Sequence, residues 1–114
     1  ISKESVLKYK NSRHGQYSVI KVEGNLVNDP VANEFKQVIY DLMDKGEKYI
    51  AIDCSEMQFI GSSGIGKLLL AYKRITDLGG KIAVVYLHPE MKDLFIAFKL
   101  QEFISICDSL DELV

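Results

Sequence analysis

The chain has 114 residues, of which 47% are hydrophobic and 26% are charged, a composition typical of a single soluble globular domain. Its formal net charge of -2 excludes the strong basic excess of nucleic-acid-binding domains, and a cluster formed by Lys8, Lys10, Arg13 and His14 is interpreted as a solvated edge. No run approaches the ~18 apolar residues of a membrane-spanning helix, and the N-terminus lacks an apolar signal core, so we expect a cytoplasmic protein.

The first periodic segment is residues 17–23, where side chains alternate in direction and β-branched residues are frequent. This pattern predicts a strand, and Gly24 ends it. Residues 5–10 are a candidate hairpin partner, joined to this strand through a glycine-containing loop at residues 11–16.

A helix is predicted to begin at Asp29 and Pro30, because a capping side chain followed by proline is typical of a helix start. Apolar residues then recur at helical spacing until Gly46, which is expected to close the helix. Residues 49–53 form a short apolar run bounded by charge, which predicts a buried strand.

A second amphipathic helix is predicted over residues 62–78, ending at Gly79 and Gly80. Residues 81–87 are rich in Val and Ile and predict another buried strand. The core stripe of the helix is expected to consist of Ile65, Leu68, Leu69, Tyr72 and Ile75.

Pro89 opens a third predicted helix, and residues 103–107 predict a last edge strand. Residues 109–114 resemble the start of a terminal helix, because Ser109 and Glu112 have the spacing of a capping box. The order β-β-α-β-α-β-α-β-α predicts an α/β fold in one domain over residues 1–114, with a single mixed sheet of about five strands and about four helices.

The two cysteines, Cys54 and Cys107, lie far apart and lack a CxxC spacing. We interpret them as reduced, partly buried residues of a cytosolic protein. Because few other ligand-type side chains accompany them, the sequence predicts no metal site and no cofactor.

Three glycines and two serines gather at the start of the second predicted helix. One interpretation is a P-loop, since Gly61, Gly66 and Lys67 match the GxxxxGK pattern. The hydroxyl residue that would help to hold magnesium is replaced by Leu68, so a nucleotide-binding P-loop-like protein stays as the third hypothesis.

A second interpretation is the GxSxG nucleophile elbow of hydrolases, but Ile65 stands where a glycine should follow Ser63. The two histidines available as a base are His14 and His88. Since His88 precedes Pro89, a turn or helix-cap role is its simpler interpretation. We therefore do not expect an enzyme.

A third interpretation is a modifiable hydroxyl, at Ser63 or alternatively at Ser62. Unpaired backbone N–H groups and the helix dipole favour an anion at a helix start. A phosphate there would add about -1.5 to -2 of charge near neutral pH. A Ser-Ser-Gly sequence before an apolar helix is also typical of a plain N-cap, and composition alone favours that structural role.

One face of the second predicted helix, turned away from its core stripe, favours a docking surface beside the serine. Gly66 lies on this face and costs ~1 kcal/mol relative to alanine inside a helix, which either a closely approaching partner or tight internal packing would explain. We predict a partner-binding surface that consists of Asn28, Gly61, Ser62, Ser63, Gly64, Gly66, Lys67, Leu70 and Arg74.

Residues 49–55 end in Asp-Cys-Ser, residues 59–66 read Phe-Ile-Gly-Ser-Ser-Gly-Ile-Gly, and residues 103–113 combine a strand with Asp-Ser-Leu-Asp-Glu. These segments, with Gly24 and Leu26, resemble the STAS domain, and in particular bacterial anti-sigma factor antagonists, over nearly the whole chain. The resemblance implies a STAS-like fold.

The resemblance makes Ser63 the phosphoacceptor, because it occupies the second serine of the family signature Asp-Ser-Ser-Gly-Leu-Gly. It also implies the partners. The unmodified protein would bind an anti-sigma factor that is a serine kinase with a histidine-kinase-like ATPase fold, and would thereby release a sigma factor. Phosphorylation would end this interaction, and a PP2C-type phosphatase would restore it.

Two positions depart from the family pattern. Gly61 replaces the aspartate of the signature, and Val27 replaces the aspartate of a Gly-x-Leu-Asp turn; both carboxylates are expected near the phosphoacceptor. These departures motivate a second hypothesis, a STAS interaction module of another signalling pathway that is not switched by phosphorylation.

An exposed β edge is compatible with a monomer or a weak dimer.

Overall fold

Five strands form one sheet in the order β1-β2-β3-β4-β5, in which β1 is antiparallel to β2 and the other neighbouring pairs are parallel. The computed structural model describes residues 7–113. Within them the strands are β1 (Tyr9–His14), β2 (Tyr17–Val22), β3 (Tyr49–Asp53), β4 (Lys81–Val85) and β5 (Ser105–Cys107). The single mixed sheet that the sequence predicts is confirmed.

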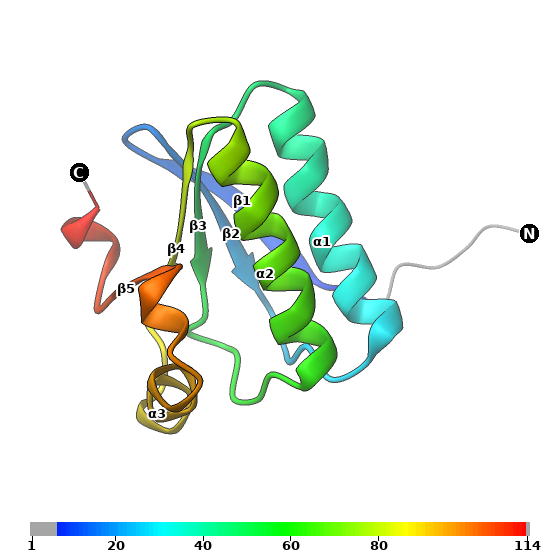
Figure 1. The fold of residues 1–114 in the computed structure, drawn as a ribbon, viewed down its shortest axis with the longest axis vertical. Coiled ribbons are helices and arrows are strands. Elements are labelled where there is room, and N and C mark those ends of the chain that lie inside the picture. The colour runs from blue at the N-terminus through cyan, green and yellow to red at the C-terminus, as the bar shows by residue number, and fades with distance from the viewer. Residues whose placement is uncertain (1–6, 114) are drawn as a thin grey trace, which may run out of the picture.

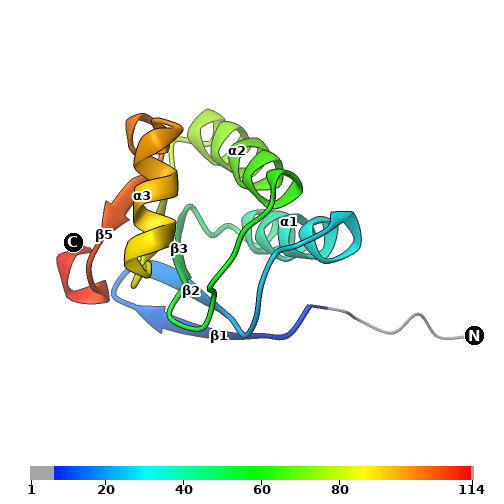
Figure 2. The same ribbon diagram turned by 90° about the horizontal axis from the view of Figure 1, so that it is seen from below.

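The described residues form three α-helices, α1 (Asp29–Asp44), α2 (Ser62–Asp77) and α3 (Pro89–Ala97), and two short 3-10 helices, η1 (Leu100–Glu102) and η2 (Leu110–Glu112). Figure 1 shows α1 and α2 side by side, and Figure 2 shows both on the same face of the sheet. Each parallel strand pair is joined by a crossover helix, as the alternating pattern predicts. No helix in this part of the chain has the length and apolar character needed to cross a membrane.

The main core lies between the sheet and the helices. Ile20 of β2 and Ile52 of β3 are buried there against Phe35 of α1 and Leu68 of α2, and α3 extends the same cluster with Met91. The edges of α1 and α2 that face away from this core remain open to solvent.

A smaller cluster covers the opposite face of the sheet. Tyr17, Val19 and Ala51 are buried there, and Leu110 of η2 and Leu113, which follows η2, pack against them. Helix α2, including its start, lies on the other face of the sheet (Figure 2).

The N-terminal hairpin differs from its prediction. His14 pairs with Tyr17, so a two-residue turn joins β1 to β2, and Gly15 in that turn has a φ of +59°. The predicted loop is wrong where it covers residues 11–14, which are strand; the predicted strand 5–10 begins outside the described residues. β1 is an edge strand with mostly exposed side chains, so it has no alternating apolar pattern to detect.

The start of α1 lies one residue from its predicted cap. Asn28 is the N-cap, and its Oδ1 accepts a hydrogen bond from the N–H of Val31 at 3.3 Å. The assignment of Asp29 as the cap is wrong, because Asp29 already belongs to the helix. Its carboxylate still lies in the first turn, where it interacts favourably with the helix dipole.

The predicted terminal helix is a single 3-10 turn, η2, in the described residues, so the structure has three α-helices where about four were predicted. Ser109 makes no side-chain cap, and the predicted capping box is wrong. The carboxylate of Glu112 instead accepts a hydrogen bond from the N–H of Asp108 at 2.9 Å. Glu112 therefore holds a tight turn rather than the start of an α-helix.

Candidate functional site

Ser63 lies inside the first turn of α2. The N-cap is Gly61, which has no side chain to accept a hydrogen bond from the helix start, so Ser62 and Ser63 are the first two helical residues. Neither serine caps the helix. Among residues 7–113, neither hydroxyl has a hydrogen-bond partner. The interpretation of these serines as a plain N-cap is wrong, and the Ser63 hydroxyl is free to react or to bind.

The segment before Ser63 is held by the segment that follows β2. The Oδ1 of Asn25 accepts hydrogen bonds from the N–H groups of Gln58 and Phe59 at 2.8 and 3.1 Å. The N–H of Gly61 donates to the carbonyl of Leu26 at 2.8 Å. Two loops that are far apart in sequence thus position the start of α2. The sequence does not predict the role of Asn25, because this contact spans 33 residues and leaves no local pattern.

The two positions that depart from the family pattern lie next to each other. A Cβ placed on Gly61 would be 3.2 Å from the carbonyl oxygen of Val27 and 3.7 Å from the ring of Phe59. Val27 and Phe59 are about half exposed, at 51% and 52%. Neither position carries a charged side chain, and a side chain at Gly61 would meet the backbone carbonyl oxygens of Val27 and Leu26 and the ring of Phe59.

The structure places the predicted surface residues of α2 at three depths. Ser62, Gly66 and Leu70 are exposed, whereas Ser63, Lys67 and Arg74 are partly buried, as is Gly61. Gly64 is buried and lies under the surface rather than in it. Asn28 is exposed but its amide oxygen is engaged in the α1 cap.

Gly64 and Gly66 have opposite surroundings although both lie in the first two turns of α2. A Cβ on Gly64 would be 2.7 Å from Cγ1 of Ile60 and 2.9 Å from Cβ of Leu26. A Cβ on Gly66 would have no neighbour within 4 Å. Internal packing therefore explains Gly64 but not Gly66, and the open space at Gly66 is available to a partner.

Arg74 forms intramolecular contacts at the far end of this surface. Its guanidinium lies 4.2 Å from the centre of the Tyr40 ring and donates to the carboxylate of Asp44 at 3.0 Å, so it joins α2 to α1. Lys36 approaches the same ring at 5.4 Å. The predicted partner-binding surface is therefore continuous with a structural contact between the two helices.

Two open grooves flank the start of α2. One, of about 320 Å³, is lined by Ser62, Ile65, Gly66, Leu69, Phe98 and Leu100. The other, also of about 320 Å³, is lined by Asn25, Val27, Asn28, Pro30 and Val31. Phe98, in the lining of the first groove, is 60% exposed and adds apolar surface to that groove.

The structure does not support the two enzymatic interpretations. Gly66 and Lys67 lie within the helix, so the GxxxxGK match forms no phosphate-cradling loop. His88 is the N-cap residue of α3, and its Nε2 lies 3.0 Å from the carbonyl oxygen of Ser55. It makes no hydrogen bond to Ser63.

The cysteines are free thiols, of which Cys54 is buried and Cys107 is partly buried. Burial, and to a smaller degree the charge of Asp53, raises the pKa of the Cys54 thiol far above its ordinary value. Burial also raises the pKa of Cys107, with further contributions from Glu112 and Asp108. Neither environment is that of an activated nucleophile, and no metal-binding cluster of His, Cys, Asp and Glu occurs within residues 7–113.

The chain is similar to known proteins, to one in sequence and to others in fold. The protein BtrV of Bordetella bronchiseptica, which carries the name of an anti-sigma factor antagonist, is 26% identical over 81 residues, covering 71% of this chain and 67% of BtrV. The crystal structure of a protein from Thermotoga maritima, which also carries the name of an anti-sigma factor antagonist, has a TM-score of 0.84 at 21% identity. This match covers 91% of this chain and 89% of that one. The phosphorylated form of SpoIIAA, a cell fate determinant of Bacillus, has a TM-score of 0.70 at 17% identity, over 93% and 96%.

The two solved structures are less than a quarter identical in sequence, so they show the fold. The model of the STAS domain family matches residues 8–113, from β1 through η2, and includes the whole of the Ser63 segment. The chain belongs to the STAS domain family.

Proposed function

We propose that this chain is an anti-sigma factor antagonist switched by phosphorylation of Ser63. In its unmodified form it binds an anti-sigma factor that is also a serine kinase, and so controls sigma-factor-dependent transcription. Phosphorylation of Ser63 ends the interaction, and a PP2C-type phosphatase restores it. The chain is then a cytoplasmic ligand and substrate of enzymes, a monomer or weak dimer, rather than an enzyme itself.

The observation that carries this proposal is the unpaired Ser63 hydroxyl in the first turn of α2, three residues before the open Gly66. A hydroxyl without a structural role can be modified without loss of a hydrogen bond. The names of BtrV and of the Thermotoga maritima protein, and the phosphorylated form of SpoIIAA, support the same function.

The position of Ser63 makes phosphorylation compatible with folding. Gly61 leaves the first N–H groups of α2 without a side-chain cap, and the positive end of the helix dipole lies there. A phosphate would add about -1.5 to -2 of charge to a segment, residues 57–66, that has no charged residue of its own. The fold is preserved while the charge of the exposed surface changes.

The experiment combines the purified chain with its cognate kinase and ATP and follows intact mass. We expect a single added phosphate that is absent from Ser63→Ala and present in Ser62→Ala, which serves as the matched control. Labelling that persists in Ser63→Ala but disappears in Ser62→Ala would move the site to Ser62.

The second candidate function is a STAS interaction module that is not switched by phosphorylation. The adjacent replacements Gly61 and Val27 favour it, because they remove both family carboxylates from the neighbourhood of the hydroxyl. Ser63→Asp separates the two functions. A switched antagonist loses partner affinity with this change, whereas a constitutive module keeps it.

A further inference from the structure

Lys67 lies one helical turn after Ser63. Residues four apart on a helix project from the same face, with Cβ atoms about 5–6 Å apart. Both side chains are partly buried, and the spacing of four residues places them on the same face of α2. A flexible four-carbon side chain easily spans one turn toward the helix start.

Lys67 has no carboxylate within ion-pair distance among residues 7–113. Arg74, the other cation on this face of α2, is held by Asp44 at 3.0 Å. The positive charge of Lys67 is therefore available to an anion, whereas that of Arg74 is already engaged.

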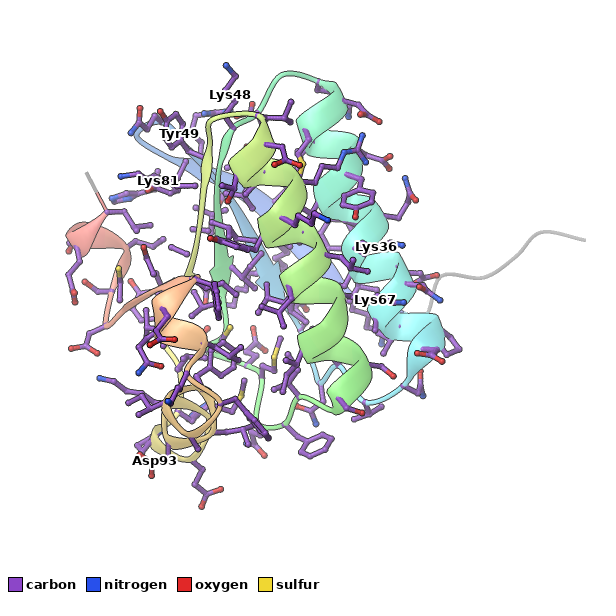
Figure 3. The ribbon with its side chains drawn as sticks, viewed as in Figure 1. Lys36, Lys48, Tyr49, Lys67, Lys81 and Asp93 are labelled. Atoms are coloured by element: carbon purple, nitrogen blue, oxygen red, sulfur yellow. The ribbon has the colours of Figure 1, made fainter. Side chains whose placement is uncertain are left out.

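Within residues 7–113, the charged groups that α1 presents near this face form no ion pair with Lys67. α1 contributes Asp29 in its first turn and Lys36, which lies 5.4 Å from the Tyr40 ring. Figure 3 shows Lys67 reaching from α2 toward α1, on the side of the helical layer where Lys36 also lies. The positive charge of Lys36 on this side adds to that of Lys67, so this region favours the binding of an anion.

We propose that Lys67 is the intramolecular counter-ion of a phosphate on Ser63. This inference rests on the proposed function in taking Ser63 as the modified residue, and it adds how the modified state is stabilised. Before modification, the Lys67 ammonium is free to pair with an acidic side chain of the partner. After modification, the phosphate engages it, so the surface gains negative charge and loses an available cation at the same time.

The test installs phosphoserine at position 63 during synthesis, without a kinase, and titrates the phosphate by phosphorus NMR at low salt. In the chain with Lys67, we expect the second pKa of the phosphate to be lower by about 0.2 to 0.4 pH unit than in Lys67→Gln, the shift expected of an ion pair at i,i+4. Lys67→Arg should restore most of the shift, and high salt should reduce it.

Two matched controls separate a specific pair from the general field of the helix. Lys73→Gln removes an exposed lysine from the same helix and should leave the phosphate pKa unchanged. Phosphoserine at position 62 is off the Lys67 face, and its pKa should not respond to Lys67→Gln.

Equal phosphate pKa values in the chain with Lys67 and in Lys67→Gln would overturn the proposal, as would loss of the folded circular dichroism spectrum when phosphoserine is installed at position 63. Because no kinase takes part, this outcome is independent of the kinase experiment. A chain that no kinase accepts can still show the ion pair, and a chain that is phosphorylated efficiently can lack it.

Discussion

The guanidinium of Arg74 lies against the ring of Tyr40, 4.2 Å from its centre, and also binds Asp44, so one side chain of α2 makes two contacts with α1. The side chain of Arg74 is 42% exposed, which weakens its ion pair through solvent screening. Because Arg74→Ala removes both the ion pair and the cation–π contact, we expect it to lower the free energy of unfolding by about 1 kcal/mol. Urea denaturation measures this free energy.

Two variants make the Arg74 prediction specific. Arg74→Lys keeps the charge but loses the flat stacking of the guanidinium, so it should recover only part of the loss. Lys73→Ala changes the neighbouring exposed residue and should have an effect close to zero. Equal unfolding midpoints for Arg74→Ala and Lys73→Ala would contradict the prediction.

The two glycines at the start of α2 should respond to alanine with opposite signs. Gly66→Ala adds a methyl group in open space within a helix and should stabilise the fold by about 0.5–1 kcal/mol. Gly64→Ala adds one only 2.7 Å from a buried Ile60 carbon and should destabilise it, because overpacking costs about 1–3 kcal/mol. Thermal or urea unfolding of both variants measures the difference, and a Gly64→Ala midpoint at or above that of Gly66→Ala would refute the packing argument.

These glycines also show what the sequence can and cannot predict. The helix over residues 62–78 is predicted from apolar periodicity, and it agrees with α2 to within one residue. The buried stripe of the structure includes Gly64, Leu68, Ala71 and Ile75. Gly64 has no side chain to contribute to a hydrophobic pattern, so the sequence placed it with the surface residues. Its burial follows only from how closely α2 approaches Ile60.

The contacts that position Ser63 are equally invisible in the sequence. Strand β3 is predicted with its observed bounds, because a buried parallel strand is a continuous apolar run. The pairing of Leu26 with Ile60 joins two irregular segments that lie far apart in sequence, so no local pattern predicts it. The family signature pointed to Ser63 as the candidate residue. Only the tertiary structure shows which contacts hold the segment that precedes it.

Asn25 should control the order of the segment before α2. Its Oδ1 accepts two backbone hydrogen bonds, so Asn25→Ala leaves the N–H groups of Gln58 and Phe59 without a protein partner. These donors are exposed and water replaces part of the loss, so we expect a cost of about 1 kcal/mol, at the low end for two bonds. Hydrogen exchange of the Gln58 and Phe59 amides should accelerate several-fold. Asn25→Asp keeps the acceptor oxygen, so the Gln58 and Phe59 amides should stay protected from exchange. If Asn25→Ala accelerates exchange only at other residues, Asn25 does not have this role.

The two thiols should differ in reactivity with pH. Cys54 is buried and its pKa is strongly raised, so it should react with a thiol reagent only after unfolding. Cys107 is partly buried with a raised pKa, so near pH 8 its thiolate fraction and its labelling rate should lie below those of a free cysteine. Its rate should rise as the pH increases toward the raised pKa. If Cys107 in the folded chain is labelled at or above the rate of free cysteine, burial and the nearby carboxylates do not raise the pKa of its thiol, and the prediction is wrong.

The last prediction separates folding from partner binding at Gly66. Because no internal contact explains this glycine, a partner that approaches the helix backbone there should be displaced by a methyl group. We expect Gly66→Ala to weaken binding to the proposed partner about ten-fold or more, although the variant is the more stable protein. Thr76→Ala also increases helix propensity, but lies at the exposed far end of α2, and should stabilise without loss of affinity. Isothermal titration of both variants decides the matter: undiminished affinity in Gly66→Ala means that the partner does not contact α2 at this turn.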